Sequence, residues 1–223
     1  MRAKHLISGL ALILVFAGCG GSVTSRGVAQ LRAISAVSNP TRIDVFTDFN
    51  LIASDLTNGE GAGYSNQTAT QLTLGVREFG ETQTLASGNL DAAPGEKFTI
   101  LPHQTGNSTI GILAIADNAT TPAAGKFKLR LVHVDRLVGG VDVYVVNPGA
   151  DLSLETPVLA NVVFQKATAY VELTAGIQKD IVITSTGTTN QLGNLISLTP
   201  ANGSIRTLMF FDSSGPALTL YSD

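Results

Sequence analysis

Hydrophobic and polar residues alternate along much of the chain with a period of two, which is typical of β-strands. The clearest case is Val141, Val143 and Val145, which alternate with Asp142 and Tyr144. Asn-Pro-Gly and Asn-Gly turn signals follow or separate such runs. Helical periodicity is weak throughout, so the pattern predicts an all-β fold.

The second half of the chain repeats the first. LRAISAVSNPTRIDVF begins at Leu31 and LRLVHVDRLVGGVDVY begins at Leu129. Further on, QLTLGV loosely matches YVELTAGI, and GEKFTIL matches GSIRTLM. Each copy ends on an apolar segment followed by an aspartate, Asp117 and Asp223. Copies of about 90 residues suit two tandem β-sandwich domains and are too long for solenoid repeats.

The first residues differ from everything that follows. Arg2 and Lys4 precede an apolar run at residues 6–17, which is shorter than the roughly 20 residues that a spanning helix needs. A basic start, a short apolar run and small residues are typical of a secretory signal peptide. We therefore expect residues 1–18 to be removed.

The four residues Phe16-Ala17-Gly18-Cys19 resemble a bacterial lipobox, although Phe16 stands where leucine is usual. The resemblance implies cleavage before Cys19 and acylation of its thiol and amine. Two or three acyl chains would anchor the protein stably to a membrane. Gly20, in place of an aspartate, favours the outer membrane. The alternative is an ordinary secretory signal with a chance cysteine.

These features divide the chain into five parts. Residues 1–18 are the signal peptide, and residues 19–30 are the lipidated cysteine and a flexible tether. Residues 31–117 and 129–223 are the two sandwich repeats, joined by a linker at residues 118–128 that is rich in threonine, alanine, proline and glycine.

Composition narrows the possible partners. After loss of Arg2 and Lys4 the mature chain keeps 12 basic and 17 acidic residues, a formal charge of −5. No basic patch stands out, which argues against nucleic acid as a partner. Cys19 is the only cysteine, so no disulfide stabilises the fold and the apolar core must hold it.

The start of the second copy carries a family resemblance. The run ADNATTPAAGKFKLRLVHVD, followed by GGVDVYV, resembles a tandem bacterial envelope domain, domain of unknown function 4397. The resemblance covers nearly all of residues 31–223 and is weaker in the first copy, where Ser35 replaces His133. It implies immunoglobulin-like sandwiches and brings no established activity.

His133 is one of two histidines in the mature chain and lies on the same face as Leu129 and Leu131. One hypothesis makes it a metal ligand, with Asp135 or Asp142 nearby. The other makes it a structural histidine that hydrogen-bonds the adjacent loop. We prefer the second, because a metal site normally needs three or four ligands.

Two charge pairs recur at matching positions. Arg32 and Asp44 of the first copy correspond to Arg130 and Asp142 of the second. They could form a paired recognition site. We prefer two strand-to-strand ion pairs, or unconnected exposed charges, which contribute about 0–1 kcal/mol when exposed.

Catalytic and cofactor signatures are absent from the sequence. It has no GxSxG elbow and no HExxH motif, so we expect no enzyme, no cofactor and no metal. The glycine-rich segment at residues 59–63 indicates a flexible loop tip that could make contacts. Sugar binding is poorly supported, because there is no tryptophan and we place Tyr144 and Tyr170 in the core.

The sequence therefore predicts a non-catalytic, lipid-anchored protein of the cell envelope. Its role would be structural or adhesive, through contacts with an unidentified envelope protein or polymer. An alternative is a periplasm-facing accessory subunit whose edge strand pairs with a partner. A hydrolase is the least favoured class, for lack of a nucleophile with its base.

Overall fold

The computed structural model describes residues 27–48 and 50–223. The predicted signal peptide, Cys19 and most of the tether lie outside the described residues and stay predictions. The described residues form an all-β molecule whose one helical element is a short 3₁₀ turn, η1 (Leu152–Leu154). None of the described residues belongs to a helix long and apolar enough to cross a bilayer.

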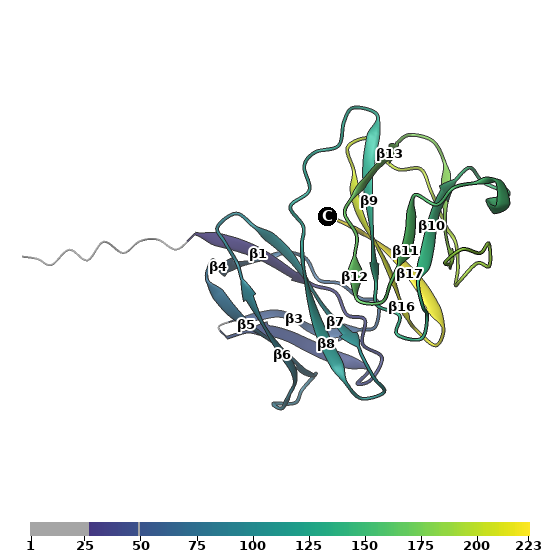
Figure 1. Cartoon of the computed structure of the whole chain (residues 1–223). Coiled ribbons are helices and arrows are strands. Elements are labelled where there is room, and N and C mark those ends of the chain that lie inside the picture. Colours follow the sequence, from purple (N-terminus) through teal and green to yellow (C-terminus); the bar gives the residue numbers. More distant parts are fainter. Residues whose placement is uncertain (1–26, 49) are drawn as a thin grey trace, which may run out of the picture.

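The first half of the described chain is a sandwich of two four-stranded sheets (Figure 1). One sheet has the strand order β4-β1-β7-β8 and the other the order β3-β2-β5-β6. The bounds are β1 Val28–Ala33, β2 Arg42–Thr47, β3 Leu51–Thr57, β4 Ser65–Thr68, β5 Gln71–Glu78, β6 Thr84–Asp91, β7 Lys97–Gln104 and β8 Ile110–Ala116.

The second half is a sandwich of the same design. Its sheets have the orders β12-β9-β16-β17, with β13 also paired to β9, and β11-β10-β14-β15. The bounds are β9 Lys126–His133, β10 Val141–Val146, β11 Leu159–Val162, β12 Lys166–Ala167, β13 Val171–Thr174, β14 Lys179–Ser185, β15 Ile196–Leu198, β16 Ile205–Asp212 and β17 Pro216–Ser222.

The two halves share topology and register, as the repeat predicts. Strand β1 pairs in parallel with β7, and β9 pairs in parallel with β16, so that Arg32 lies opposite Thr99 in one half and Arg130 opposite Thr207 in the other. The loose match of QLTLGV with YVELTAGI is wrong. QLTLGV begins β5, whose counterpart is β14, because β5 pairs with β2 as β14 pairs with β10.

Both expected boundaries are shifted by a few residues. β1 begins at Val28, inside the segment expected to be tether, and β9 begins at Lys126, inside the expected linker. Strand pairing explains both shifts, because Val28 pairs with Thr68 and Lys126 pairs with Thr174.

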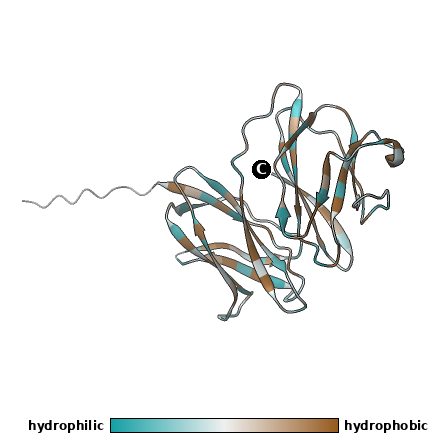
Figure 2. Cartoon of the chain, viewed as in Figure 1, coloured by the Kyte–Doolittle hydropathy of each residue, from teal (hydrophilic) through white to brown (hydrophobic). Residues whose placement is uncertain are grey.

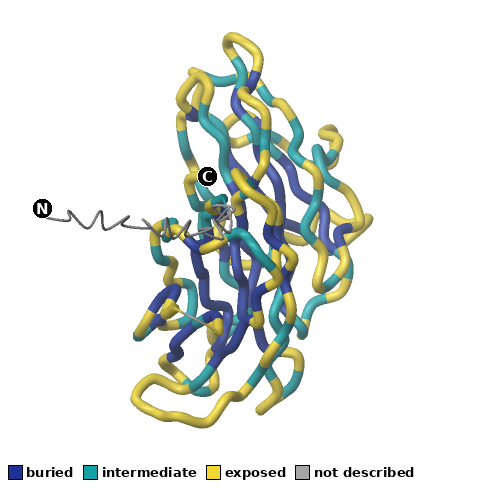
Figure 3. The backbone as a smooth tube through the Cα atoms, turned by 90° about the vertical axis from the view of Figure 1, so that its left-hand side faces the viewer, coloured by how far each residue is buried: buried dark blue, intermediate teal, exposed yellow. Residues whose placement is uncertain are grey.

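Each sandwich has its own apolar core, made by alternate residues of its strands. In β1, Ala29, Leu31 and Ala33 are fully buried in the first core, and in β9, Phe127 and Leu129 are fully buried in the second. Figure 2 shows the resulting alternation of hydrophobic and hydrophilic residues along the strands, and Figure 3 shows buried residues concentrated in them.

A third apolar cluster joins the two sandwiches. The strands β1, β7 and β8 turn their other face toward the corresponding face of β9, β16 and β17. Eight apolar side chains from both halves are buried there: Ile34, Ala36, Leu101, Ile115, Val132, Val134, Met209 and Phe211. The two sandwiches are therefore packed together rather than joined by the linker alone.

The glycine-rich segment 59–63 contacts the second sandwich rather than standing free as a loop tip. The Tyr221 hydroxyl donates to the Gly59 carbonyl at 2.6 Å. Gly59 has a φ of +82°, and a Cβ there would lie 2.8 Å from the Phe211 ring. Only glycine fits this contact without strain.

Candidate functional site

The two recurring arginines lie at the contact between the sandwiches, not at an exposed surface. Arg32 projects from β1 and Arg130 from β9, on the faces that meet the other half. Arg32 is 5% exposed and Arg130 is 2% exposed. A buried guanidinium needs compensating acceptors, and each arginine finds them in both halves.

Arg32 binds its own half and the other half at once. Its Nε donates to Thr99 Oγ1 at 2.7 Å, and its Nη1 donates to the Ser222 carbonyl at 2.5 Å. Its Nη2 forms an ion pair with the Asp223 carboxylate. Thr99 in turn donates to Asp117 Oδ2 at 2.6 Å, which links the arginine to the aspartate of its own half.

Arg130 makes the reciprocal set of contacts. Its Nε donates to Thr207 Oγ1 at 2.8 Å, and its Nη1 donates to the Ala116 carbonyl at 2.8 Å. Its Nη2 pairs with the Asp117 carboxylate, while Thr207 donates to Asp223 Oδ2 at 2.5 Å. Each arginine is thus paired with the aspartate that ends the other half. We call these residues the crossed cluster.

A tyrosine from each half completes the crossed cluster. The Tyr64 hydroxyl donates to Asp117 Oδ2 at 2.7 Å, and the Tyr170 hydroxyl donates to Asp223 Oδ2 at 2.8 Å. The guanidinium carbons of Arg32 and Arg130 lie 4.8 and 4.7 Å from the centroids of these two rings. Burial, and then the hydrogen bond to Asp117, raise the pKa of Tyr64 above its ordinary value; burial also raises the pKa of Tyr170.

The expected pairs Arg32–Asp44 and Arg130–Asp142 are wrong, and the four side chains are not exposed. Asp44 and Asp142 are each 4% exposed, but they lie in the other sheet of their sandwich, on β2 and β10. Strand alternation points the arginines toward the interface and these aspartates toward the far outer faces, so the core separates them.

Asp44 and Asp142 each accept a hydrogen bond from the backbone of the neighbouring strand. Asp44 Oδ1 accepts from the backbone N–H of Asp55 at 3.1 Å, and Asp142 Oδ1 accepts from that of Asn161 at 2.7 Å. Asp55 and Asn161 have φ of 62° and 50°, at register shifts in the pairing with β3 and β11. Each aspartate therefore stabilises a β-bulge.

His133 makes the contact with the adjacent loop that the structural hypothesis describes. It is fully buried, and its Nε2 lies 2.8 Å from the Gly139 carbonyl of the adjacent loop. The backbone N–H of Asp135 donates to its Nδ1 at 3.3 Å, which places the ring proton on Nε2. Burial lowers the pKa of His133. Among the described residues no group of three histidine, cysteine or acidic side chains could hold a metal ion.

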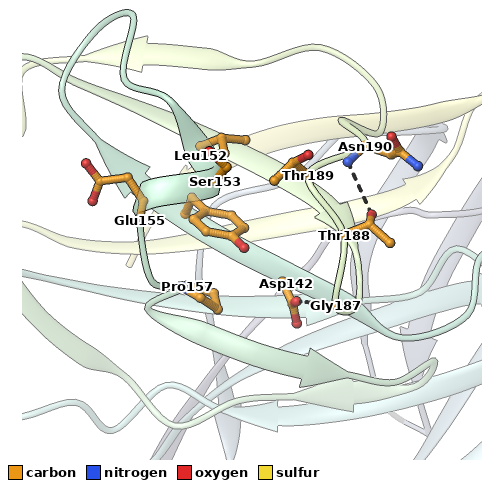
Figure 4. Close-up of a pocket in the computed structure, with 10 residues that line it drawn as sticks. Asp142, Leu152, Ser153, Glu155, Pro157, Gly187, Thr188, Thr189 and Asn190 are labelled. Atoms are coloured by element: carbon orange, nitrogen blue, oxygen red, sulfur yellow. Dashed lines mark hydrogen bonds between the residues drawn. The ribbon is translucent and has the colours of Figure 1, made fainter.

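An open pocket of about 670 Å³ lies on the outer face of the second sandwich, away from the crossed cluster. Figure 4 shows Leu152, Ser153 and Glu155 on one side and the turn after β14 on the other, with Asp142 between them. Asp142 Oδ2 accepts from the backbone N–H of Gly187 at 2.8 Å. Tyr144, which we expect in a core, is 6% exposed in a small apolar cluster with Val146 and Val182, and it also lines this pocket.

Sequence reasoning missed the partners of the arginines. Asp117 and Asp223 were recognised as the matching ends of the two copies, but not as partners for the arginines of the opposite copy. Tyr170 was assigned to a core and lies in the crossed cluster. A usable signal was present, because Tyr64 and Tyr170 are separated by the same 106 residues as Asp117 and Asp223.

Comparison with known proteins identifies the family and little else. No curated protein matches the chain. Among solved structures, a family 26 carbohydrate-binding module from Eubacterium rectale Amy13K in complex with maltoheptaose is 11% identical, with 87% of this chain and 97% of that chain covered and a TM-score of 0.28. A streptococcal virulence factor described as binding α-glucan is 8% identical over the same shares, with a TM-score of 0.33. At these TM-scores neither likeness says what this chain binds.

The family model "Domain of unknown function (DUF4397)" matches residues 29–144, slightly more than half of the chain. The match runs from β1, through the whole first sandwich, to Tyr144 of β10. It includes Arg32, Asp117 and Arg130 of the crossed cluster. The chain therefore belongs to the DUF4397 family.

Proposed function

We propose that this protein is a lipid-anchored, non-catalytic component of the bacterial cell envelope that holds a contact surface in a fixed position relative to its first sandwich. The contact surface would be the outer face of the second sandwich, where the open pocket of about 670 Å³ lies. The partner would be an envelope protein or polymer. The lipid would be attached at Cys19, and Gly20 favours the outer membrane.

The crossed cluster is the observation that carries this proposal. Because each arginine pairs with the aspartate of the other half, the two sandwiches cannot turn against each other without separating buried charges. The apolar cluster at the same interface adds a second constraint. A chain anchored ahead of β1 would therefore present the second sandwich at a set distance and orientation relative to the first.

The histidines support a role without catalysis. His133 contacts backbone groups through both ring nitrogens. His103 lies 3.2 Å from the Leu101 carbonyl through Nδ1, and its Nε2 lies 2.9 Å from the side-chain amide of Gln165. The hydrogen-bond partners described for His133 and His103 do not include a serine, threonine or tyrosine hydroxyl that a histidine base could activate.

Membrane fractionation with protease shaving of intact cells tests the proposal. Wild-type protein should fractionate with the membrane, and the Cys19→Ala variant should not. Cleavage of the wild type by external protease would support a surface contact role, and protection would support a periplasmic partner. If the Cys19→Ala protein fractionates as the wild type does, the anchoring proposal is wrong.

A further inference from the structure

The first sandwich shows how its outer face is filled. Arg77 Nε donates to Asp44 Oδ2 at 3.1 Å, and its guanidinium carbon lies 5.2 Å from the centroid of the Phe46 ring. Phe46 in turn lies against Gly75, where an added Cβ would come within 2.3 Å of the ring. A carboxylate, an aromatic ring and a guanidinium therefore form one packed group on this face.

The second sandwich keeps two of these three groups. Asp142 and Tyr144 occupy the places of Asp44 and Phe46 on the corresponding strand. Across the sheet, Asp44 is opposite Arg77, whereas Asp142 is opposite Thr184. The second copy therefore retains the carboxylate and the ring but has a short neutral side chain where the first copy has its guanidinium.

Among the described residues, Asp142 lacks the guanidinium partner that Asp44 has in Arg77, because Thr184 stands at the position of Arg77. In the part of the chain that the structure describes, Asp142 has no cationic side chain within 4.0 Å; the hydrogen bonds described for its carboxylate come from the backbone N–H groups of Asn161 and Gly187. Thr184 is fully buried, and its Oγ1 has no hydrogen-bond partner in the same described part. Register places Thr184 beside Asp142 on the same face.

Asp142 and Tyr144 both line the open pocket of about 670 Å³, whereas the buried Thr184 lies outside its lining. Asp142 and Glu155 are its ionisable acids, and Tyr144 is its aromatic residue. A neighbouring pocket of about 230 Å³ shares Leu152 and adds Asp180. Neither lining contains lysine, arginine or histidine, so the charge of this face favours a cation.

We infer that this pocket binds a guanidinium group, such as the side chain of arginine, in the place that Arg77 fills in the first sandwich. Guanidinium is planar, pairs with carboxylates and stacks on aromatic rings, which are the two features that Asp142 and Tyr144 offer. The inference deepens the proposed contact role by naming the chemistry of the partner.

The inference is tested by exchanging the residues at the two equivalent positions, Arg77 of the first sandwich and Thr184 of the second. Thr184→Arg should place a guanidinium in the pocket and abolish binding of methylguanidinium, measured by calorimetry on the purified full-length protein in detergent. Thr184→Ser keeps the hydroxyl and the space, so its affinity should match that of the wild type. Arg77→Thr should open the equivalent space in the first sandwich and raise the stoichiometry from one site to two.

Glu155→Gln gives an independent readout that does not disturb the bulge. Glu155 is exposed at the rim, so its loss should weaken binding while leaving the unfolding transition unchanged. We expect affinity to decrease by a factor of about 1.4 to 5, the range for losing one partly screened charge. Methylammonium at the same concentration should bind more weakly, because it cannot stack as a plane.

Two probes distinguish a small-molecule guanidinium from the arginine side chain of a protein partner. Equal affinity for methylguanidinium and for a Gly-Arg-Gly peptide would indicate a small-molecule site, and tighter binding of the peptide would indicate an arginine of a protein partner. Absence of binding by both probes, or unchanged binding in Thr184→Arg, would overturn the inference. Neither result depends on Cys19, so it would leave the anchoring proposal standing.

Discussion

At the scale of single residues, Asp117 and Asp223 decide how the sandwiches are joined. Each carboxylate accepts hydrogen bonds from a threonine and a tyrosine of its own half and pairs with an arginine of the other. The side chains of Asp117 and Asp223 are 1% and 3% exposed. Removing one charge from such a group leaves the opposite charge buried and uncompensated.

Asp117→Asn should therefore destabilise the protein by about 3–5 kcal/mol, the range for breaking a buried ion pair on one side. Urea unfolding followed by circular dichroism measures the change. Asp55→Asn is the matched control, because Asp55 pairs with Arg42 at the solvent-exposed surface. Equal unfolding midpoints for Asp117→Asn and the wild type would contradict the assigned role of the crossed cluster.

The two buried histidines give the protein an acid-sensitive stability. Burial lowers the pKa of His133 and of His103 below the ordinary value of 6.5. The unfolded chain consequently binds more protons than the folded chain below that value, and the free energy of unfolding falls as pH decreases through it.

Unfolding midpoints should therefore be lower near about pH 5.5 than near about pH 7.5. His133→Gln should reduce this difference, since glutamine does not titrate and can still donate to the Gly139 carbonyl. His103→Gln should reduce it independently. Asp135 lies close to His133 and its pKa is raised by burial, so measurements should stop above the carboxylate range. An unchanged difference in both variants would refute the prediction.

At the scale of elements, the alternation of hydrophobic and polar residues was enough to predict strands, because a strand that buries one face places hydrophobic residues at every second position. The matching segments of the two copies were enough to predict the repeat. Neither pattern could show which sheet a given strand joins. Arg32 and Asp44 stand twelve residues apart in consecutive strands, and only the three-dimensional pairing places those strands in different sheets. The expected ion pairs failed for that reason.

Strand β5 shows how one residue controls the packing of an element. Gly75 lies opposite Phe46, whose ring covers the space where a side chain would stand. Gly75→Ala should destabilise the protein by about 1–3 kcal/mol through overpacking, measured by chemical denaturation.

Gly88 on the neighbouring strand β6 is the control for this substitution, because a Cβ there meets no atom within 4 Å. Gly88→Ala should leave stability equal or slightly higher, since alanine has less conformational freedom to lose on folding. If the two variants unfold at the same denaturant concentration, Phe46 does not occupy the position that the structure gives it.

At the scale of the whole molecule, the two sandwiches should unfold as one unit. The buried apolar cluster and the crossed cluster both span the interface, so neither half keeps its surface covered when the other unfolds. Differential scanning calorimetry should show a single transition for the wild type.

Met209→Asp should divide that transition into two. Met209 is 1% exposed in the interface cluster, and a buried carboxylate without a partner would separate the halves. Small-angle X-ray scattering should record a larger radius of gyration. Leu85→Asp, at a position that is 41% exposed on β6, should leave both measurements unchanged. One transition in both variants would show that the interface does not couple the sandwiches.

The reciprocal contact between the halves has the geometry of a symmetric dimer, in which one surface meets a copy of itself. In a dimer of identical chains, any substitution at such a surface appears on both sides. Joining the copies in one polypeptide removes that restriction, so each side can vary alone. His103 in β7 and Phe211 in β16 occupy equivalent positions, as do Ser35 and His133. A fused pair can therefore keep one copy as a scaffold while the other acquires new chemistry.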